Sequence, residues 1–387
     1  MSVTAAKGFV AAGVAAGIRK QRLDLALVRT TAPAVGCAMF TTNRVQAAPV
    51  VVSKRHLELA EPQAIVLNSG SANAATGAQG EADAIATAAE AARLLCVRPE
   101  QVLVCSTGVI GAPLPMPKLL AGMKRAVRKL SPEGGDDAAE AIMTTDTHAK
   151  TAAVARDGFV VGGMAKGAGM IHPALATMLC VITTDYPLEA GEADGFLRPA
   201  VEASFNRISV DGECSTNDAV CLLANGASRI ERSPATDTSF AAALLQVCAD
   251  LSAQIVSDGE GATMLLEIEV GGAESDAQAA AIARRIATSP LVKTAAFGRD
   301  ANWGRVLAAA GSAPWNGGFA ALDQTRLSLA FNGTAVFEDG MPLGVEPSFD
   351  GSVCTIALDL GLGAGSSSYL ASDLTYDYVR INADYRT

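Results

Sequence analysis

The order of apolar and polar residues predicts strands and helices that alternate along most of the chain. Short apolar runs between small or polar residues are typical of buried strands, and they occur at 64–67, 101–105, 159–163 and 177–184. Apolar residues at helical spacing predict helices over 81–95, 116–130 and 240–256. Alternation of this kind is typical of sheets that are covered by helices.

The last third of the chain continues the mixture on a smaller scale. It predicts a helix at 277–286 and strands at 264–270, 327–331, 353–358 and 376–381. Patches rich in Gly, Ser and Pro predict loops at 312–318 and 361–368. We therefore expect a mixed fold, α+β or α/β, with a smaller C-terminal α+β domain that starts near residue 285.

Composition limits the classes of partner. The 387 residues are 50% apolar and carry a net charge of -10, which disfavours nucleic acid and anionic membranes because both need a basic surface. No apolar run reaches the ~18 residues of a membrane helix, and the first ten residues do not resemble a signal peptide. The eight cysteines include no C-x-x-C pair, so we expect a cytoplasmic protein whose thiols are reduced.

Several common catalytic sites find little support. The three histidines, His56, His148 and His172, do not occur in the spacing of a nucleophile elbow or a metal site, so we expect no metal. The Gly-rich stretch 162–170 does not match a phosphate-binding loop, because Lys166 lies inside the glycine run and no helix-forming segment follows it.

A threonine nucleophile would need no histidine. When Thr or Ser is the first residue of a chain, its own α-amino group, with a pKa of ~8, can act as the base. This requires cleavage of the preceding peptide bond. Thr177 begins a β-prone run directly after the small-residue segment 173–176, a suitable place for such a cut, although this pattern alone does not select it.

A series of motifs along nearly the whole chain identifies Thr177 as the candidate nucleophile through a family resemblance. They include Lys7-Gly-Phe, Cys105-Ser-Thr107-Gly108-Val-Ile-Gly111, Ile142-Met-Thr144-Thr145-Asp146-Thr147, the segment from Met164 to Leu179, Ser215-Thr-Asn-Asp218, Ser257-Asp-Gly-Glu260-Gly-Ala-Thr263, Asn302-Trp-Gly-Arg305 and the end from Tyr378 to Thr387. In these motifs the chain resembles the ArgJ family, the self-cleaving ornithine/glutamate N-acetyltransferases of arginine biosynthesis.

The resemblance implies a mechanism. Cleavage after Ala176 would give an α chain of residues 1–176 and a β chain of residues 177–387. The freed Thr177 would take the acetyl group from N-acetylornithine and pass it to glutamate in a ping-pong reaction, with no cofactor. The same likeness implies a layered α-β-β-α body, like that of the DmpA aminopeptidases, and a heterotetramer of two α and two β chains.

The resemblance also assigns site residues. Thr107 and Gly108 correspond to the family's oxyanion hole, which stabilises negative charge on the reacting carbonyl oxygen. The residues expected to line the substrate pocket are Thr144, Lys166, Thr177, Glu260, Asn382 and Thr387. Thr145 and Thr147 remain alternatives to Thr144, because sequence does not show which hydroxyl points inward.

Other functions remain open at this point. A related self-processing aminopeptidase or amidase would use water in place of glutamate, and a non-catalytic binding or assembly protein could retain the fold. A bifunctional enzyme would also take acetyl groups from acetyl-CoA, for which no phosphate-binding motif is recognisable.

Overall fold

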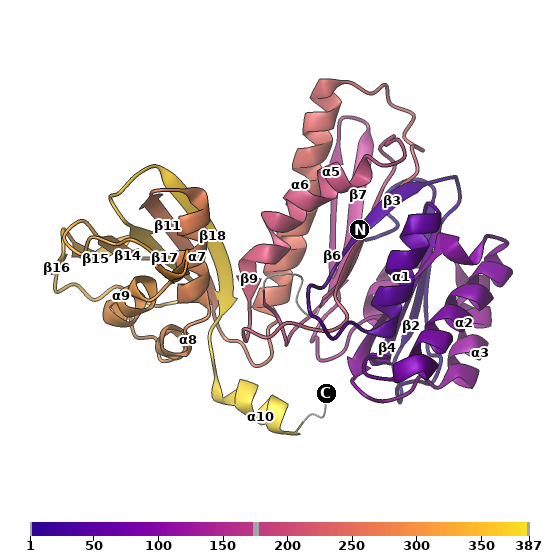
Figure 1. Cartoon of the computed structure of the whole chain (residues 1–387), viewed down its shortest axis with the longest axis horizontal. Coiled ribbons are helices and arrows are strands. Elements are labelled where there is room, and N and C mark those ends of the chain that lie inside the picture. The colour runs from indigo at the N-terminus through magenta and orange to yellow at the C-terminus, as the bar shows by residue number, and fades with distance from the viewer. Residues whose placement is uncertain (1, 173–177, 385–387) are drawn as a thin grey trace. The chain divides into compact units, whose positions relative to one another are not determined.

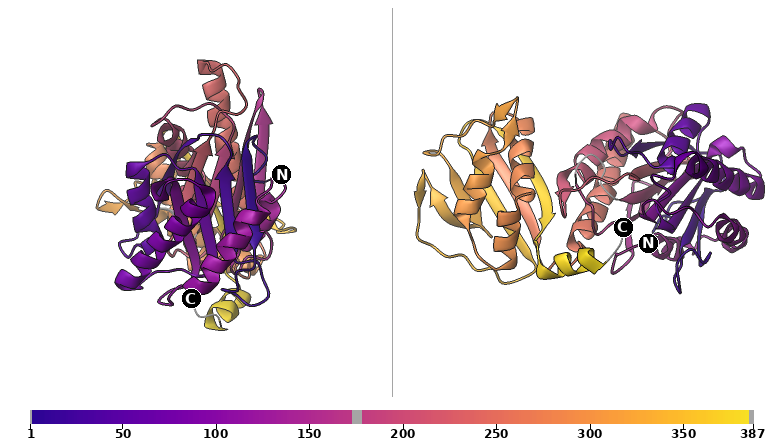
Figure 2. Two further views of the ribbon diagram at one scale, coloured as in Figure 1. Left: turned by 90° about the vertical axis from the view of Figure 1, so that its right-hand side faces the viewer. Right: turned by 60° about the horizontal axis from the view of Figure 1, so that its bottom comes forward.

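The computed structural model describes residues 2–172 and 178–384, which form two compact units (Figures 1 and 2). The described part of the first unit runs to Asn206 and includes Glu213–Ile255. The second unit contains Arg207–Gly212 and the residues from Val256 to 384. It thus takes in residues that lie before the boundary near 285 expected from the sequence.

Two sheets form the centre of the first unit. The four-stranded sheet has the order β1 (Phe9–Val14), β2 (Leu25–Thr30), β4 (Ala64–Ser71), β5 (Val102–Val109). The five-stranded sheet has the order β3 (Val35–Phe40), β10 (Ala219–Ala224), β8 (Leu179–Thr184), β7 (Phe159–Lys166), β6 (Lys150–Arg156). Side chains of both sheets, among them Leu67, Leu103, Val181 and Leu223, belong to one buried cluster, so the sheets pack face to face.

Helices cover the outer faces of both sheets (Figure 1). The four-stranded sheet carries α1 (Ala48–Leu59), α2 (Gly77–Leu95) and α3 (Met116–Lys129), while α4 (Gly135–Ala141) contacts β1. The five-stranded sheet carries α5 (Ala193–Glu202) and α6 (Pro234–Ser257). The layers therefore follow the order α-β-β-α, which confirms the expected fold class.

Small residues allow the helices to approach the sheets closely. A Cβ at Gly163 of β7 would lie only 3.0 Å from Leu251 and 3.1 Å from Val247, so α6 packs on the bare backbone of the strand. By length and apolar composition alone, α6 could span a membrane. Its residues Phe240, Leu244, Val247 and Leu251 are fully buried in the first unit, as expected of a core helix.

The second unit is built on one seven-stranded sheet. Its order is β16 (Met341–Pro342), β15 (Thr334–Glu338), β14 (Ser328–Phe331), β17 (Val353–Asp359), β11 (Leu265–Ala273), β18 (Gly365–Ser372), β9 (Ile208–Ser209). The remaining elements are α7 (Asp276–Ala287), α8 (Pro290–Phe297), α9 (Trp303–Gly311), the hairpin β12 (Pro314–Trp315) and β13 (Gly318–Phe319), and α10 (Tyr376–Asp384). Buried residues of α7, α8 and α9 join those of the strands in one core.

Three sequence predictions in this unit were wrong, and one of them is the loop predicted at 312–318, which contains β12 and the first residue of β13. Residues 376–381, predicted as a strand, lie in α10, where the Thr375 hydroxyl accepts a hydrogen bond from the Tyr378 N–H at 3.1 Å and so caps the helix. Residues 361–368, predicted as a loop, include the start of β18. The Ser-rich composition concealed an alternation in which Ser366 and Ser368 are exposed while Ser367 and Tyr369 are buried.

Aromatic packing beneath α6 predicts a large loss of stability on truncation. The Phe240 ring stacks on Tyr186 with centroids 4.5 Å apart and meets Phe159 edge-on at 6.0 Å. Phe240→Ala should lower the free energy of unfolding by about 3–5 kcal/mol, measured by urea denaturation. Leu245→Ala is the control on the same helix, because that side chain is 39% exposed. Equal losses in the two variants would contradict this assignment of the core.

Candidate active site

The bond predicted to be cut lies outside the described residues. Ala176 and Thr177 belong to the undescribed segment 173–177, and Thr387 to the undescribed end of the chain. The described chain resumes at Met178, directly before β8. Strand pairing places Lys166 of β7 on one side of Leu179 and Ala219 of β10 on the other. The described start of β8 is therefore held by both neighbouring strands.

Thr107 and Gly108 lie at the end of β5, beside the end of β4. Thr107 is buried and pairs with Ser69 in the parallel register. Gly108 has φ +128°, in the region that favours glycine, and a Cβ there would lie 2.5 Å from the Gly70 carbonyl carbon. No other residue fits this close approach, so the local backbone accounts for the glycine of the predicted oxyanion pair.

Asp146 organises the segment that contains Thr144. Its carboxylate accepts hydrogen bonds from the Thr144 N–H at 2.8 Å, from the Gly167 N–H at 2.7 Å and from Lys150 Nζ at 2.7 Å. Arg19 adds a guanidinium hydrogen bond to the Thr144 carbonyl oxygen at 3.1 Å. Thr144 is half-buried in this arrangement, as is Thr145, whereas Thr147 is exposed.

Lys166 lies at the end of β7 and is only 2% exposed. Burial by itself would raise the pKa of Asp146, but the charges of Lys166 and Lys150, with hydrogen bonds from Lys150 and the Thr144 N–H, hold it well below its usual range. Asp146 is therefore a buried carboxylate stabilised by two ammonium groups, one of which belongs to a predicted substrate-binding residue.

Asp218 is a buried acid that sequence reasoning did not assign to the site. It follows the segment 215–217 and is fully buried, and its Oδ1 accepts a hydrogen bond from the Met178 N–H at 3.0 Å. Burial raises the pKa of Asp218 well above its usual range, against the effects of the Met178 N–H and of the Lys166 charge. The only signal in the sequence was its place in a family motif.

The second unit contains Glu260 and Asn382. Asn382 Nδ2 donates a hydrogen bond of 2.8 Å to Glu260 Oε2, so these two predicted pocket residues are brought together. The loop behind Glu260 is held by Asp373, which accepts hydrogen bonds from the Thr263 N–H at 2.9 Å and the Thr263 hydroxyl at 2.5 Å. Burial lowers the pKa of nearby Lys293 to about 8, opposed by the charges of Asp373 and Asp211.

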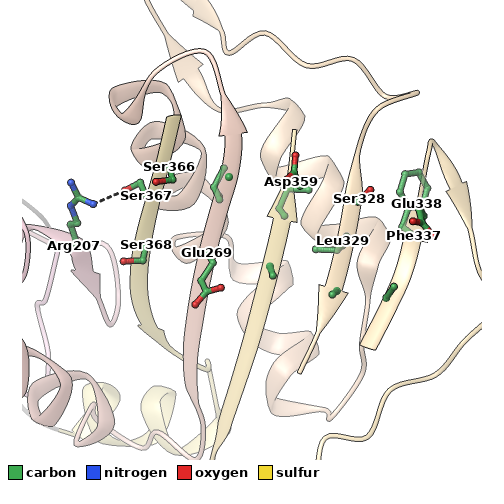
Figure 3. Close-up of a pocket in the computed structure, with 16 residues that line it drawn as sticks. Arg207, Glu269, Ser328, Leu329, Phe337, Glu338, Asp359, Ser366, Ser367 and Ser368 are labelled. Carbon is green, nitrogen blue, oxygen red and sulfur yellow. Dashed lines mark hydrogen bonds between the residues drawn. The ribbon is translucent and has the colours of Figure 1, made fainter. Parts of the chain in front are cut away.

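Other features of the described residues offer weaker sites. His56 is buried, with Nδ1 2.8 Å from the Val102 carbonyl oxygen, a core position. Within the described ranges, no group of three His, Cys, Asp or Glu side chains could hold a metal. A cavity of about 680 Å³ lies on the seven-stranded sheet and contains none of the predicted site residues (Figure 3). Arg207 at its edge donates a hydrogen bond of 2.8 Å to Ser367.

The buried ion pair predicts a pH-dependent stability. Asp146→Asn leaves Lys150 and Lys166 without its charge and should lower the free energy of unfolding by about 3–5 kcal/mol at pH 7. Because the folded pKa of Asp146 lies below the ordinary value of 3.8, its contribution is present above that pH and is lost as the pH falls further. Urea denaturation between pH 7 and pH 2 measures the difference between wild type and variant.

The control for this prediction is a surface ion pair. Asp194→Asn removes the contact with Arg198 on the surface, where the Asp194 side chain is 49% exposed and that of Arg198 is 53% exposed. This variant should change stability little at any pH. A difference between Asp146→Asn and wild type that persisted unchanged to pH 2 would contradict the stabilising role of the charge.

Comparisons with known proteins identify the family. The model of the ArgJ family matches residues 10–387. A relative from Mycolicibacterium paratuberculosis, named arginine biosynthesis bifunctional protein ArgJ, is 49% identical over 99% of this chain and 96% of its own length. A protein of the same name from Streptomyces coelicolor is 47% identical over the full length of both chains.

A solved structure is also similar to part of the chain. It is ornithine acetyltransferase from Mycobacterium tuberculosis in complex with ornithine, 49% identical over 45% of this chain and 96% of the solved chain, with a TM-score of 0.44. The family match covers nearly every residue, including all the predicted site positions. This chain belongs to the ArgJ family and is an acetyltransferase of arginine biosynthesis.

Proposed function

We propose that the enzyme transfers an acetyl group from N2-acetyl-L-ornithine to L-glutamate through an acetyl-enzyme on Thr177. The observation that supports this most is the family match from residue 10 to the end of the chain, together with relatives nearly half identical along their whole lengths. The reaction rests on self-cleavage of the Ala176–Thr177 bond, which would free the α-amino group of Thr177.

The proton transfers then need only that amino group and the hydroxyl. The amine takes the hydroxyl proton while Thr177 Oγ bonds to the acetyl carbon of N-acetylornithine. When the carbon–nitrogen bond of the substrate breaks, the same proton passes to the departing amine, and ornithine leaves. Glutamate attacks the acetyl ester by the reverse sequence, which yields N-acetylglutamate and restores the free Thr177.

Thr107 and Gly108 are the proposed donors to the developing oxyanion. In such a site one well-placed donor contributes ~3–4 kcal/mol to transition-state stabilisation. The close approach of Gly108 to the end of β4 supports this role, since it leaves the backbone at the end of β5 rigid. Preorganised donors stabilise charge without having to reorient during the reaction.

The proposed substrate contacts follow the charges of the two amino acids. Lys166 would attract an α-carboxylate, and Glu260 would attract the distal ammonium group of ornithine. Thr144, Asn382 and Thr387 would complete the pocket with neutral hydrogen-bonding groups and the chain end. We further propose that the cleaved chains assemble as a heterotetramer of two α and two β chains and act in the cytoplasm.

The curated relatives favour a second activity. They are named bifunctional proteins of arginine biosynthesis. We therefore propose that this enzyme also accepts acetyl groups from acetyl-CoA. The acetyl-enzyme on Thr177 would be the same, so glutamate could react with it whichever donor had formed it.

Substitution of Thr177 tests both cleavage and nucleophile. The wild-type chain should run as two bands on a denaturing gel, with masses that sum to 39.4 kDa. Thr177→Ala should give a single uncut band and no acetyl transfer, whereas Thr177→Ser should retain some processing because it keeps a hydroxyl. Acetyl transfer by Thr177→Ala would disprove the assignment of the nucleophile.

Donor choice tests the bifunctional proposal. Purified wild-type enzyme with glutamate and acetyl-CoA as the sole donor should form N-acetylglutamate, measured by mass spectrometry. Thr177→Ala provides the control for non-enzymatic acetylation. Activity with N-acetylornithine but none with acetyl-CoA would mean that this chain is monofunctional.

A further inference from the structure

The segment Ser215–Asp218 makes hydrogen bonds to both sheets of the first unit, at the end of β5 and just before the start of β8. It leads directly into β10, which begins at Ala219 in the five-stranded sheet. Asn217 is 5% exposed and Asp218 is fully buried, although both side chains are polar. Buried polar side chains are costly unless they make hydrogen bonds, so their partners indicate what they do.

Asn217 holds the ends of two strands of the four-stranded sheet. Its Nδ2 donates to the Ala72 carbonyl oxygen at 2.6 Å, just after β4, and to the Ser106 carbonyl oxygen at 2.9 Å, in β5. The Thr216 hydroxyl donates to Asn217 Oδ1 at 2.6 Å, so the amide orientation is fixed. Ser106 immediately precedes Thr107 and Gly108, and Asn217 therefore anchors the strand that carries them.

Asp218 holds the start of β8 in the five-stranded sheet. Its Oδ1 accepts the Met178 N–H at 3.0 Å, and the Ala219 N–H donates to the Met178 carbonyl oxygen at 3.1 Å. The backbone carbonyl oxygen of Asp218 accepts a hydrogen bond from the Thr41 N–H at 3.1 Å, which also holds the Asp218 backbone in place. Met178 is the residue bonded to Thr177 in the sequence.

We propose that Asn217 and Asp218 are positioning residues for acetyl transfer: Asn217 sets the strand end that carries Thr107 and Gly108, and Asp218 sets the strand start that follows Thr177. The two side chains belong to adjacent residues, so one short segment ties the strand end that carries Thr107 and Gly108 to the strand start that follows Thr177 in the sequence. This inference rests on the function proposed above. A misplacement of about 1 Å between reacting groups lowers a rate on the order of 100-fold.

Alanine and isosteric variants separate this role from simple stabilisation. Asp218→Ala removes the acceptor for the Met178 N–H and should lower kcat on the order of 100-fold, with KM for N-acetylornithine nearly unchanged. Asp218→Asn keeps an acceptor oxygen and should restore most of kcat. Asn217→Ala should lower kcat in the same way, and Asn217→Ser, which retains one donor, should lower it less.

Asp185→Ala is the matched control. Asp185 is equally buried and lies at the other end of β8, where its carboxylate accepts the Val160 N–H at 2.7 Å and the Lys7 N–H at 3.2 Å. This variant should lose thermal stability without loss of kcat. Melting temperatures of all variants show which ones fold, and the Asn217 pair decides the question if Asp218→Ala does not.

Three results would overturn the inference. They are a folded Asp218→Ala or Asn217→Ala with wild-type kcat, a loss in Asp185→Ala as large as in Asp218→Ala, and a failure of Asp218→Asn to recover activity. A wild-type enzyme that does not transfer acetyl from N-acetylornithine to glutamate would instead contradict the proposed function. The wild-type assay therefore distinguishes the two failures.

Discussion

The burial of apolar side chains between two sheets packed face to face is the constraint on which the first unit depends. Their facing side chains form a buried apolar core, so a polar group placed between the sheets must find its partner in the protein. Most positions satisfy this constraint by being apolar. One group of exceptions lies around the starts of β8 and β10, where Asp146, Lys150, Lys166, Asn217 and Asp218 are all buried. Asp146, Asn217 and Asp218 each hold backbone segments through hydrogen bonds.

The two buried acids in this group respond oppositely to the same surroundings. The charges of Lys166 and Lys150, with hydrogen bonds from Lys150 at 2.7 Å and from the Thr144 N–H, lower the pKa of Asp146 despite burial. Among the described residues no ammonium group donates a hydrogen bond to Asp218, and burial raises its pKa although the Met178 N–H and the Lys166 charge act against the shift. Lys166 thus influences both acids, and a carboxylate substrate bound by it would change the electrostatic balance of the whole group.

Sequence patterns located elements where composition and periodicity agreed. The Ala-rich segment at 81–95 has helical spacing and forms most of α2, and the apolar run at 64–67 begins β4. The pattern failed where composition misled. Residues 376–381 contain β-prone Tyr, Val and Ile, yet no neighbouring strand pairs with them among the described residues, and the Thr375 cap together with the Arg380–Asp377 pair favours a helix.

Sequence motifs could predict individual residues of the candidate site, but not the contacts between distant residues. Gly108 is dictated by a local contact with the end of β4, and a family motif carried that signal. The pairing of Asp218 with Met178 spans 40 residues and arises because β8 and β10 run parallel in adjacent positions. Parallel neighbours bring their strand starts together, whereas the sequence between them, which includes α5, gives no periodic signal of that pairing. Topology therefore links the end of β5, which carries Thr107 and Gly108, to the start of β8, which follows Thr177 in the sequence, and Asn217 and Asp218 are the polar residues through which that link is made.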